Sequence, residues 1–252
     1  MLIKTTLNYS PNFNPIKRDP SKIKFLIFHY TGMKKESDAI NKLKDIQSEV
    51  SSHYLIKNNG EIITLVPDLY VAWHAGKSSW KNYNNLNKYS IGIEICNPGH
   101  QFHYKKFSRH QIKSLIKLTK YLSKKYKINY KNLLGHSDIS PNRKKDPGEK
   151  FPWEYLAQNK IGYWHNLDKK ILRKFRKNKI KKKEEQLFLK NLFKIGYSKK
   201  KINNQNNIQK NIYIIKAFQR RFRQELVNGK IDEECFLISK KLAKSTIKLL
   251  EH

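Results

Sequence analysis

The spacing of hydrophobic positions predicts a mixed α/β region over residues 22–161. Short apolar runs alternate there with longer amphipathic stretches. The near-continuous apolar run KIKFLIFHY, residues 22–30, predicts a strand that is covered on both faces. The run SIGIEIC, residues 90–96, predicts a strand with its three isoleucines on one face and Glu94 on the other, because side chains alternate along a strand.

Turn and helix signals divide the rest of this region. In HYLIKNNGEIITLV, the pair Asn59-Gly60 predicts a hairpin with a type I′ turn, which needs positive φ at both central residues. A helix is predicted near residues 37–47. The stretch from Ser108 to Tyr126 has apolar residues at helical spacing with lysines opposite, so we predict an amphipathic helix with Ser108 as its N-cap.

The composition changes after Trp164. Residues 161–252 carry a formal net charge of +17, against +16 in the 160 residues before them. The predicted fold is α/β, a mixed central sheet flanked by helices, followed by a small three-helix domain. The predicted domains are residues 1–165, a basic linker 166–184 and a helical domain 185–252, with helices near 185–195, 211–226 and 232–250. The run ILRKFRKNKIKKKEE fits either a basic linker or a solvated helix.

The net charge of +33 raises the question of an anionic partner such as nucleic acid, a membrane surface or a cell-wall polymer. Lys, Asn and Ile are abundant throughout the chain, as a drift towards AT-rich codons would also produce. The basic tail does not interleave aromatic and basic residues as base-stacking platforms do. We therefore expect no dedicated nucleic-acid partner.

Cysteine usage and hydropathy bear on the compartment. The two cysteines, Cys96 and Cys235, are far apart, which excludes a disulfide framework and a thiolate zinc cluster. No apolar run reaches the roughly 18 residues that cross a bilayer, and the N-terminal residues lack the apolar core of a secretory signal. These features predict a cytoplasmic protein without a membrane span, although an exported chain trimmed of its signal would have the same sequence.

Three residues could together hold a catalytic metal. His29 ends the first predicted strand, and His136 opens the turn-rich segment GHSDISPNRKKDPG, which also contains Asp146. Two imidazoles and one carboxylate leave one position of a tetrahedral Zn²⁺ open for water, as in catalytic zinc sites. The alternative is that each histidine is a hydrogen-bonded structural group.

Two further residues fit such a site. Glu94 projects from the face of its strand opposite the isoleucines, where a carboxylate is costly to bury unless it is paired or functional. Lys144 lies two residues before Asp146, so the same loop could offer a cation to a developing oxyanion. The alternatives are a buried ion pair for Glu94 and a solvated basic run for Lys144.

Five ordered motifs carry a family resemblance: FLIFHYTGM, VSSHYLIKNNGEI, VAWHAGKSSW, NKYSIGIEICNPGH and LLGHSDISPNRKKDPGEKFPW. Over residues 21–164 they resemble the zinc-dependent N-acetylmuramoyl-L-alanine amidases of the amidase_2 family, which includes T7-lysozyme-like amidases and peptidoglycan recognition proteins. The resemblance implies one Zn²⁺ per chain on His29, His136 and Asp146, with Asp where phage relatives carry Cys. It also implies that Glu94 is the catalytic glutamate and Lys144 the catalytic lysine.

Other residues of these motifs are assigned by the same resemblance. The residues expected to contact substrate are His74, Trp73, Asn97 and Arg143. His53 is expected to be structural or to support the site from behind. His100 and His103 lie in a predicted loop without a third ligand, so we expect them to be exposed to solvent.

The C-terminal pattern IIKAFQRRFRQELVNGKIDEECFLISKKL resembles the three-helix peptidoglycan-binding module. The matching positions are Phe218, Gln219, Phe222, Gly229, Ile231 and Asp232. The module normally has Thr where Cys235 stands. The spacing of Phe218 and Phe222 also fits a plain hydrophobic core.

The resemblance implies hydrolysis of the amide bond that joins the lactyl group of N-acetylmuramic acid, or its 1,6-anhydro form, to L-alanine. The expected partner is peptidoglycan or a muropeptide, and the expected state is a monomer. The alternative is a non-catalytic peptidoglycan recognition protein, because some members of this fold bind without cutting. A third hypothesis, nucleic-acid binding through the basic tail, would show an affinity that falls steeply with salt.

Overall fold

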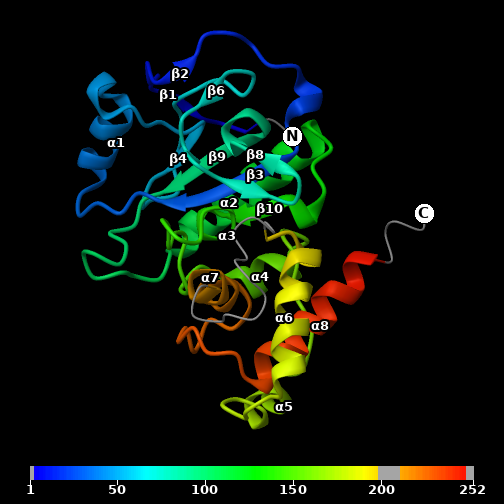
Figure 1. Ribbon diagram of the computed structural model, residues 1–252. Helices are drawn as coiled ribbons and strands as arrows, with labels where there is room; N and C mark the ends of the chain where they lie inside the picture. Colours follow the sequence, from blue (N-terminus) through cyan, green and yellow to red (C-terminus); the bar gives the residue numbers. More distant parts are fainter. Residues whose placement is uncertain (1–2, 198–210, 248–252) are drawn as a thin grey trace.

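The computed structural model describes residues 3–197 and 211–247 (Figure 1). Its strands are β1 (Thr6–Leu7), β2 (Phe13–Asn14), β3 (Phe25–Tyr30), β4 (Tyr54–Ile56), β5 (Ile62–Thr64), β6 (Val71–Ala72), β7 (Ser79–Trp80), β8 (Tyr83–Asn84), β9 (Ser90–Ile95) and β10 (Leu133–Gly135). Its α-helices are α1 (Glu36–Lys44), α2 (Arg109–Lys125), α3 (His136–Ile139), α4 (Trp153–Gln158), α5 (Lys169–Lys174), α6 (Lys182–Ile195), α7 (Ile212–Phe222) and α8 (Glu233–Ile247).

The central element is a six-stranded mixed sheet with the strand order β1-β5-β4-β9-β3-β10. Strands β4, β9, β3 and β10 run parallel to one another, whereas β5 and β1 run in the opposite direction. The carboxyl ends of β3, β9 and β10 therefore meet at one edge of the sheet, where ligands commonly bind in α/β folds. The predicted fold class is confirmed.

The two faces of β3 pack into different hydrophobic clusters. Leu26 and Phe28 join the cluster that contains the buried side of α2, whereas Phe25 and Ile27 join a cluster shared with the C-terminal helices. Because side chains alternate, His29 continues the face of Phe25 and Ile27. The strand thus presents His29 at its carboxyl end, on the face opposite α2.

Helix α2 follows the prediction closely. Ser108 is its N-cap: its Oγ accepts a hydrogen bond from Gln111 N at 3.1 Å, and Gln111 Oε1 accepts one from Ser108 N at 2.9 Å. This reciprocal capping box satisfies two of the backbone donors that a helix start leaves without partners.

The hairpin between β4 and β5 is present, but its predicted turn type is wrong. Gly60 N donates to Lys57 O and Lys57 N donates to Glu61 O, which encloses a three-residue loop. Only Gly60 has positive φ, at 86°, so the loop has the form of a turn followed by a left-handed glycine rather than type I′. Asn59 instead uses its side chain, whose Oδ1 accepts from Glu61 N.

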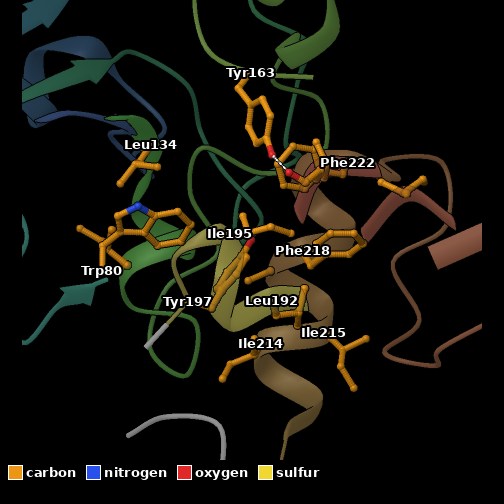
Figure 2. Close-up of a cluster of buried hydrophobic side chains, with 14 of the residues drawn as sticks. Trp80, Leu134, Tyr163, Leu192, Ile195, Tyr197, Ile214, Ile215, Phe218 and Phe222 are labelled. Atoms are coloured by element: carbon orange, nitrogen blue, oxygen red, sulfur yellow. Dashed lines mark hydrogen bonds between the residues drawn. The ribbon is translucent and has the colours of Figure 1, made fainter. Parts of the chain in front are cut away.

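The C-terminal helices lie together below the sheet and pack against it (Figure 1). Figure 2 shows the shared cluster, in which Leu134 and Trp80 from the sheet region lie near Tyr197, Phe218 and Phe222 from the C-terminal region. The segment predicted to be a basic linker contains helix α5, whose Leu172 is buried in the same cluster. Residues 198–210 and 248–252 of the predicted helical domain lie outside the described residues.

The motif positions of the C-terminal pattern are structural. Phe218 and Phe222 are buried core residues. Gln219 accepts from Gly229 N and donates to Lys230 O, and Asp232 accepts from Cys235 N, so these side chains fasten the turn before α8. Within the part of the chain that the structure describes, every helix is too short or too polar to cross a membrane.

Candidate metal centre and active site

Three predicted ligands converge at the carboxyl edge of the sheet. His29 comes from β3, His136 is the first residue of α3 directly after β10, and Asp146 lies in the loop that follows α3. Ser137 N donates to Asp146 O at 2.8 Å, which holds this loop against α3. All three side chains are buried, so rigid elements fix their positions.

The three facing atoms form a nearly equilateral triangle. His29 Nδ1 and His136 Nδ1 are 2.9 Å apart, and Asp146 Oδ2 lies 3.1 Å from the first and 3.0 Å from the second. Ligands about 2.0–2.1 Å from a tetrahedral zinc are separated by roughly 3.3 Å, so the triangle is close to the required size. Two nitrogens and one carboxylate oxygen are also donors that zinc prefers.

The outer nitrogens of both imidazoles have fixed partners. His136 Nε2 lies 3.1 Å from Ala75 O, a carbonyl that can only accept, so this nitrogen carries a proton, and in the neutral ring Nδ1 is then the nitrogen with the free lone pair. His29 Nε2 lies 3.0 Å from His74 Nδ1, and His74 Nε2 lies 3.2 Å from Ser90 Oγ. Outer contacts of this kind orient the histidine ligands of metal sites. The donor set therefore fits a metal ion.

His74 lines the pocket and also supports a proposed ligand. It lines the inner wall of the pocket but is buried, and its ring packs over Gly92, where an added Cβ would lie 2.4 Å from the ring. Its hydrogen bond to His29 makes it a support for a ligand. The sequence could not distinguish this support from a substrate contact, since both need a histidine beside the site.

His53 lies one layer further from the pocket. Its Nδ1 accepts from Gly92 N at 3.0 Å, and its Nε2 lies 3.0 Å from both Arg18 Nη2 and Tyr70 O. Burial and the positive charge of Arg18 lower the pKa of His53 to about 3. A neutral His53 thus braces the middle of β9.

Electrostatics favour a charged Asp146 carboxylate and a neutral His29 imidazole. Burial and the proximity of His136 lower the pKa of His29 to about 4. Burial alone would raise the pKa of Asp146, but the charge of His136 and hydrogen bonds from His136 and His29 hold it well below its usual range. These are the protonation states in which a histidine and a carboxylate bind metal ions.

Glu94 faces the pocket from β9, directly across from His29 on β3. Its Oε2 is buried and has no hydrogen-bond partner among the described residues. Burial and the negative charge of Asp146 raise the pKa of Glu94 to about 8. A carboxyl group with this pKa can accept and return a proton near neutral pH, which is what a general acid/base requires.

The pocket above these residues has a volume of about 480 Å³. Lys144 and Trp73 line it as half-buried residues, and Arg143 lines it as an exposed one. The guanidinium of Arg143 donates to Ala75 O at 3.1 Å and to Lys77 O at 3.3 Å, which lays it along the rim. Exposed Lys42 and Lys145 make the rim strongly positive.

Asn97 lies outside the lining of this pocket. Its side chain is buried, donates to Lys105 O and accepts from Gly99 N. It therefore fastens the loop after β9. Its place in a motif beside a catalytic strand suggested a substrate contact, but the loop turns the amide inwards.

The expectation for His100 is wrong, whereas His103 is exposed as predicted. His100 lines the pocket, stacks on Tyr104 with ring centroids 4.6 Å apart, and contacts Tyr30 Oη at 2.8 Å and Glu149 Oε2 at 3.0 Å. Tyr30 and Glu149 were missed because nothing in the sequence links them to His100 over these distances along the chain.

Comparison with known proteins agrees with the motifs. The family model described as N-acetylmuramoyl-L-alanine amidase matches residues 19–149. The N-acetylmuramoyl-L-alanine amidase AmiD of Escherichia coli K12 is 36% identical over 233 residues, which cover 88% of this chain and 82% of AmiD. The 1,6-anhydro-N-acetylmuramyl-L-alanine amidase AmpD of Haemophilus influenzae is 35% identical over 170 residues, covering 60% of this chain and 90% of AmpD.

Solved structures show the same relationship. AmiD from E. coli in complex with anhydro-N-acetylmuramic acid-L-Ala-D-gamma-Glu-L-Lys superposes with a TM-score of 0.77 at 35% identity, covering 89% of this chain and 90% of that one. AmpDh3 from Pseudomonas aeruginosa in complex with an anhydromuramic pentapeptide has a TM-score of 0.75 at 28% identity, covering 97% and 99%. Both similarities extend over the C-terminal helices as well as the sheet.

Proposed function

This chain belongs to the N-acetylmuramoyl-L-alanine amidase family, and we propose that it hydrolyses the amide bond between the lactyl group of muramic acid and L-alanine. The observation that carries the proposal is the triangle of His29, His136 and Asp146 with Glu94 facing the same pocket. A protein that only recognises peptidoglycan needs neither a metal-ligand triangle nor an unpaired carboxyl group beside it.

We propose that His29 Nδ1, His136 Nδ1 and Asp146 Oδ2 hold one Zn²⁺. When bound, zinc polarises a carbonyl group and makes water more acidic. The protein fixes the donors through Ala75 O and His74, so binding requires little rearrangement of side chains.

Glu94 is proposed as the general acid/base. Its carboxyl group accepts a proton from the attacking water and delivers it to the departing amine of L-alanine. Burial keeps its proton affinity high enough for this task, and no group in the described part of the chain hydrogen-bonds Oε2, which leaves that oxygen free to receive the proton.

Lys144 is proposed to stabilise the oxyanion that forms on the lactyl carbonyl. It is close enough to influence both Glu94 and His29 electrostatically, and its main chain is fixed by a hydrogen bond from its N–H to Ser140 O. A single oxyanion donor typically contributes about 10²- to 10³-fold in rate.

The proposed substrate class is a muropeptide with the 1,6-anhydro form of muramic acid. Two similar solved structures contain anhydromuramic peptides, and the AmpD relatives are named for this reaction. The stem peptide of such a fragment has free carboxylates, and the rim of the pocket offers Lys42, Arg143 and Lys145 to them. Trp73 on the same wall offers an aromatic ring to the sugar.

A single chain supplies every proposed ligand and catalytic group, which supports a monomer as the catalytic unit. The cytoplasmic location expected from the sequence stays a prediction.

The proposal is tested by mass spectrometry of digests of anhydroMurNAc-tetrapeptide and of intact sacculi. The purified protein is used as isolated, after chelator treatment, and after zinc is restored. Release of a peptide with a free N-terminal L-alanine, lost with chelator and recovered with zinc, is expected. Zinc-loaded protein that releases peptide from neither substrate would exclude the amidase function.

A further inference from the structure

We infer that the carboxyl end of α7 clamps two of the three proposed metal ligands, so that the C-terminal helices are part of the catalytic unit. The α7 clamp consists of Arg221, in the last turn of α7, and Gln224, two residues after the helix ends. This inference rests on the proposed function, because it takes His136 and Asp146 as ligands.

Arg221 fixes the segment that carries His136. Its Nη1 donates to Asp138 Oδ2 at 2.5 Å and its Nη2 donates to Leu133 O at 2.9 Å. Leu133 is in β10 and Asp138 is in α3, so the two contacts lie on either side of His136. One guanidinium thereby sets the angle at which α3 leaves the sheet.

Asp138 connects this contact to the start of α3. Its Oδ2 also accepts from Gly135 N at 2.8 Å, directly before His136, and its Oδ1 accepts from Tyr197 Oη at 2.9 Å. Arg221, Asp138 and Tyr197 are each at most 2% exposed. The guanidinium also lies over the ring of Trp153, 4.3 Å from its centroid. Arg221 and Tyr197 come from the C-terminal region, and they meet on the carboxylate next to the ligand.

Gln224 fixes the loop that carries Asp146. Its Nε2 donates to Glu149 O at 2.8 Å and to Phe151 O at 2.6 Å. These carbonyls follow Asp146 in the same loop, so Gln224 determines where the loop ends. Two side chains only three positions apart on the C-terminal region thus reach the segments of two different ligands.

Burial makes these contacts specific in geometry. An unpaired buried charge is costly, so Asp138 and Arg221 favour the one arrangement in which they meet. The three ligand atoms must stay within a few tenths of an ångström of their positions to bind zinc tightly. Loss of contacts that orient metal ligands typically weakens binding about 10- to 100-fold.

Arg223 provides a matched control between the two clamp residues. Its guanidinium is buried like that of Arg221, and it pairs with Asp232 and with Asn228 Oδ1 at 3.0 Å. Both partners belong to the C-terminal region. Changing Arg223 therefore perturbs a buried Arg–Asp pair of the same chemistry without touching the segments that carry the ligands.

The test compares Arg221→Lys, Gln224→Met and Arg223→Lys in the full chain. The zinc Kd is measured by competition with a chelating dye, together with Tm, kcat and KM. We expect the two clamp variants to raise the zinc Kd about 10- to 100-fold and to lower kcat more than they change KM. Arg223→Lys is expected to lower Tm while it leaves the zinc Kd within about twofold.

Wild-type zinc affinity in Arg221→Lys and Gln224→Met would overturn the clamp, and so would an equal loss of affinity in Arg223→Lys at the same Tm. If Arg221→Lys does not fold, Gln224→Met decides, because its half-buried side chain can be replaced by one of similar size. A wild-type chain that binds no zinc would overturn the proposed metal site itself, which separates that failure from a failure of the clamp alone.

Discussion

His29 and His136 each direct one ring nitrogen to the triangle and give the other to a fixed neighbour. Ala75 O accepts a hydrogen bond from the outer nitrogen of His136 and His74 contacts the outer nitrogen of His29, and neighbours of this kind orient the histidine ligands of metal sites. Glu94 stands beside this arrangement, and among the described residues its Oε2 has no hydrogen-bond partner. At the scale of single residues, the site therefore consists of three proposed metal ligands in fixed positions and, beside them, the Glu94 carboxyl group, which can take up a proton.

Replacing Glu94 by Gln is expected to lower kcat about 10²- to 10⁴-fold, since a carboxamide has the same shape but cannot take up the proton. Zinc content should remain at one per chain, because Glu94 is not among the three ligand residues. Steady-state kinetics and metal analysis of the purified variant measure both effects.

The control is Glu61→Gln in the β4–β5 hairpin, which should leave kcat unchanged because Glu61 is paired with Lys57 at the surface. Full activity in the Glu94 variant would exclude Glu94 as the acid/base.

The convergence of the three ligand residues could be predicted from the sequence, because the end of the first predicted strand and the turn-rich segment of the fifth motif point to one edge of the sheet. The hydrogen bond between His74 and His29 and the inward direction of the Asn97 amide could not. Both His74 and Asn97 lie in loops, and the direction of a loop side chain depends on contacts made far away along the chain. His100 was misjudged for the same reason, since its partners Tyr30 and Glu149 are brought to it only by the fold.

At the scale of elements, Gly92 of β9 makes space for the ring of His74, which contacts the proposed ligand His29. Gly92 leaves room for the ring of His74, which would lie 2.4 Å from a Cβ at that position. Gly92→Ala should therefore displace His74 and release His29. We expect a loss of about 1–3 kcal/mol in the free energy of unfolding and weaker zinc binding, measured by urea unfolding and chelator competition.

Ile93→Val on the same strand is the matched control, because it removes a methyl group from the opposite face and should lower stability by about 0.5–1.5 kcal/mol without changing zinc affinity. Unchanged zinc affinity in Gly92→Ala would show that His74 does not position His29.

Helix α2 should depend on its capping box for stability but not for activity. Ser108→Ala removes the hydroxyl that accepts from Gln111 N and is expected to cost about 0.5–2 kcal/mol in unfolding free energy. Urea unfolding measures the loss, with exposed Lys120→Ala on the same helix as the reference. A loss no larger than that of the reference would contradict the assigned cap.

The elements with strong local signals were predicted best. Strands β3 and β9 and helix α2 follow from their patterns because burial and capping act over neighbouring residues. The hairpin was located correctly, but its loop geometry was not, since one left-handed glycine closes a three-residue loop as well as a two-residue one.

At the scale of the whole molecule, one hydrophobic cluster joins the sheet to the C-terminal helices. The predicted boundary near residue 165 lies within this shared packing, because Tyr163 and Leu172 belong to the same cluster. Sequence patterns show that both parts have apolar faces but not that the faces meet. The buried contact between Arg221 and Asp138 could not be predicted from the sequence either, because nothing distinguishes Arg221 from the many other basic residues of this chain.

The segment that joins the sheet region to the C-terminal helices should make the free energy of unfolding depend on pH. Burial lowers the pKa of His165 to about 4, and its Nδ1 accepts from Leu167 N where the chain passes to the C-terminal helices. Between pH 6.5 and 4 the unfolded chain binds a proton at His165 that the folded chain does not bind. The contribution of His165 to the free energy of unfolding is therefore complete above pH 6.5 and is lost as the pH falls to 4. This contribution to the free energy of unfolding is at most about 3 kcal/mol.

Urea unfolding of wild type and His165→Gln at pH 7.5 and pH 5 measures this contribution as a difference in pH dependence. The exposed His110→Gln variant should keep the wild-type dependence. Identical pH dependence in wild type and His165→Gln would contradict the assignment.

The charge of +33 should act on substrate capture. Raising the ionic strength from about 0.05 M to about 0.5 M shortens the Debye length from roughly 14 Å to roughly 4 Å, so KM for an anionic muropeptide should rise more than kcat falls. Lys145→Gln at the rim should reduce this salt effect, whereas Lys183→Gln on α6 should not. An unchanged KM would leave the charge without a role in binding.

The central claim is that the pocket around Glu94 hydrolyses the amide bond next to muramic acid, and digestion of anhydroMurNAc-tetrapeptide in ¹⁸O-labelled water tests it most directly. Mass spectrometry of the products shows where the oxygen of water is incorporated. The account predicts one ¹⁸O in the lactyl carboxyl group of the sugar and none in the released peptide. Label in a carboxyl group of the peptide, or an intact substrate after incubation with zinc-loaded protein, would contradict it.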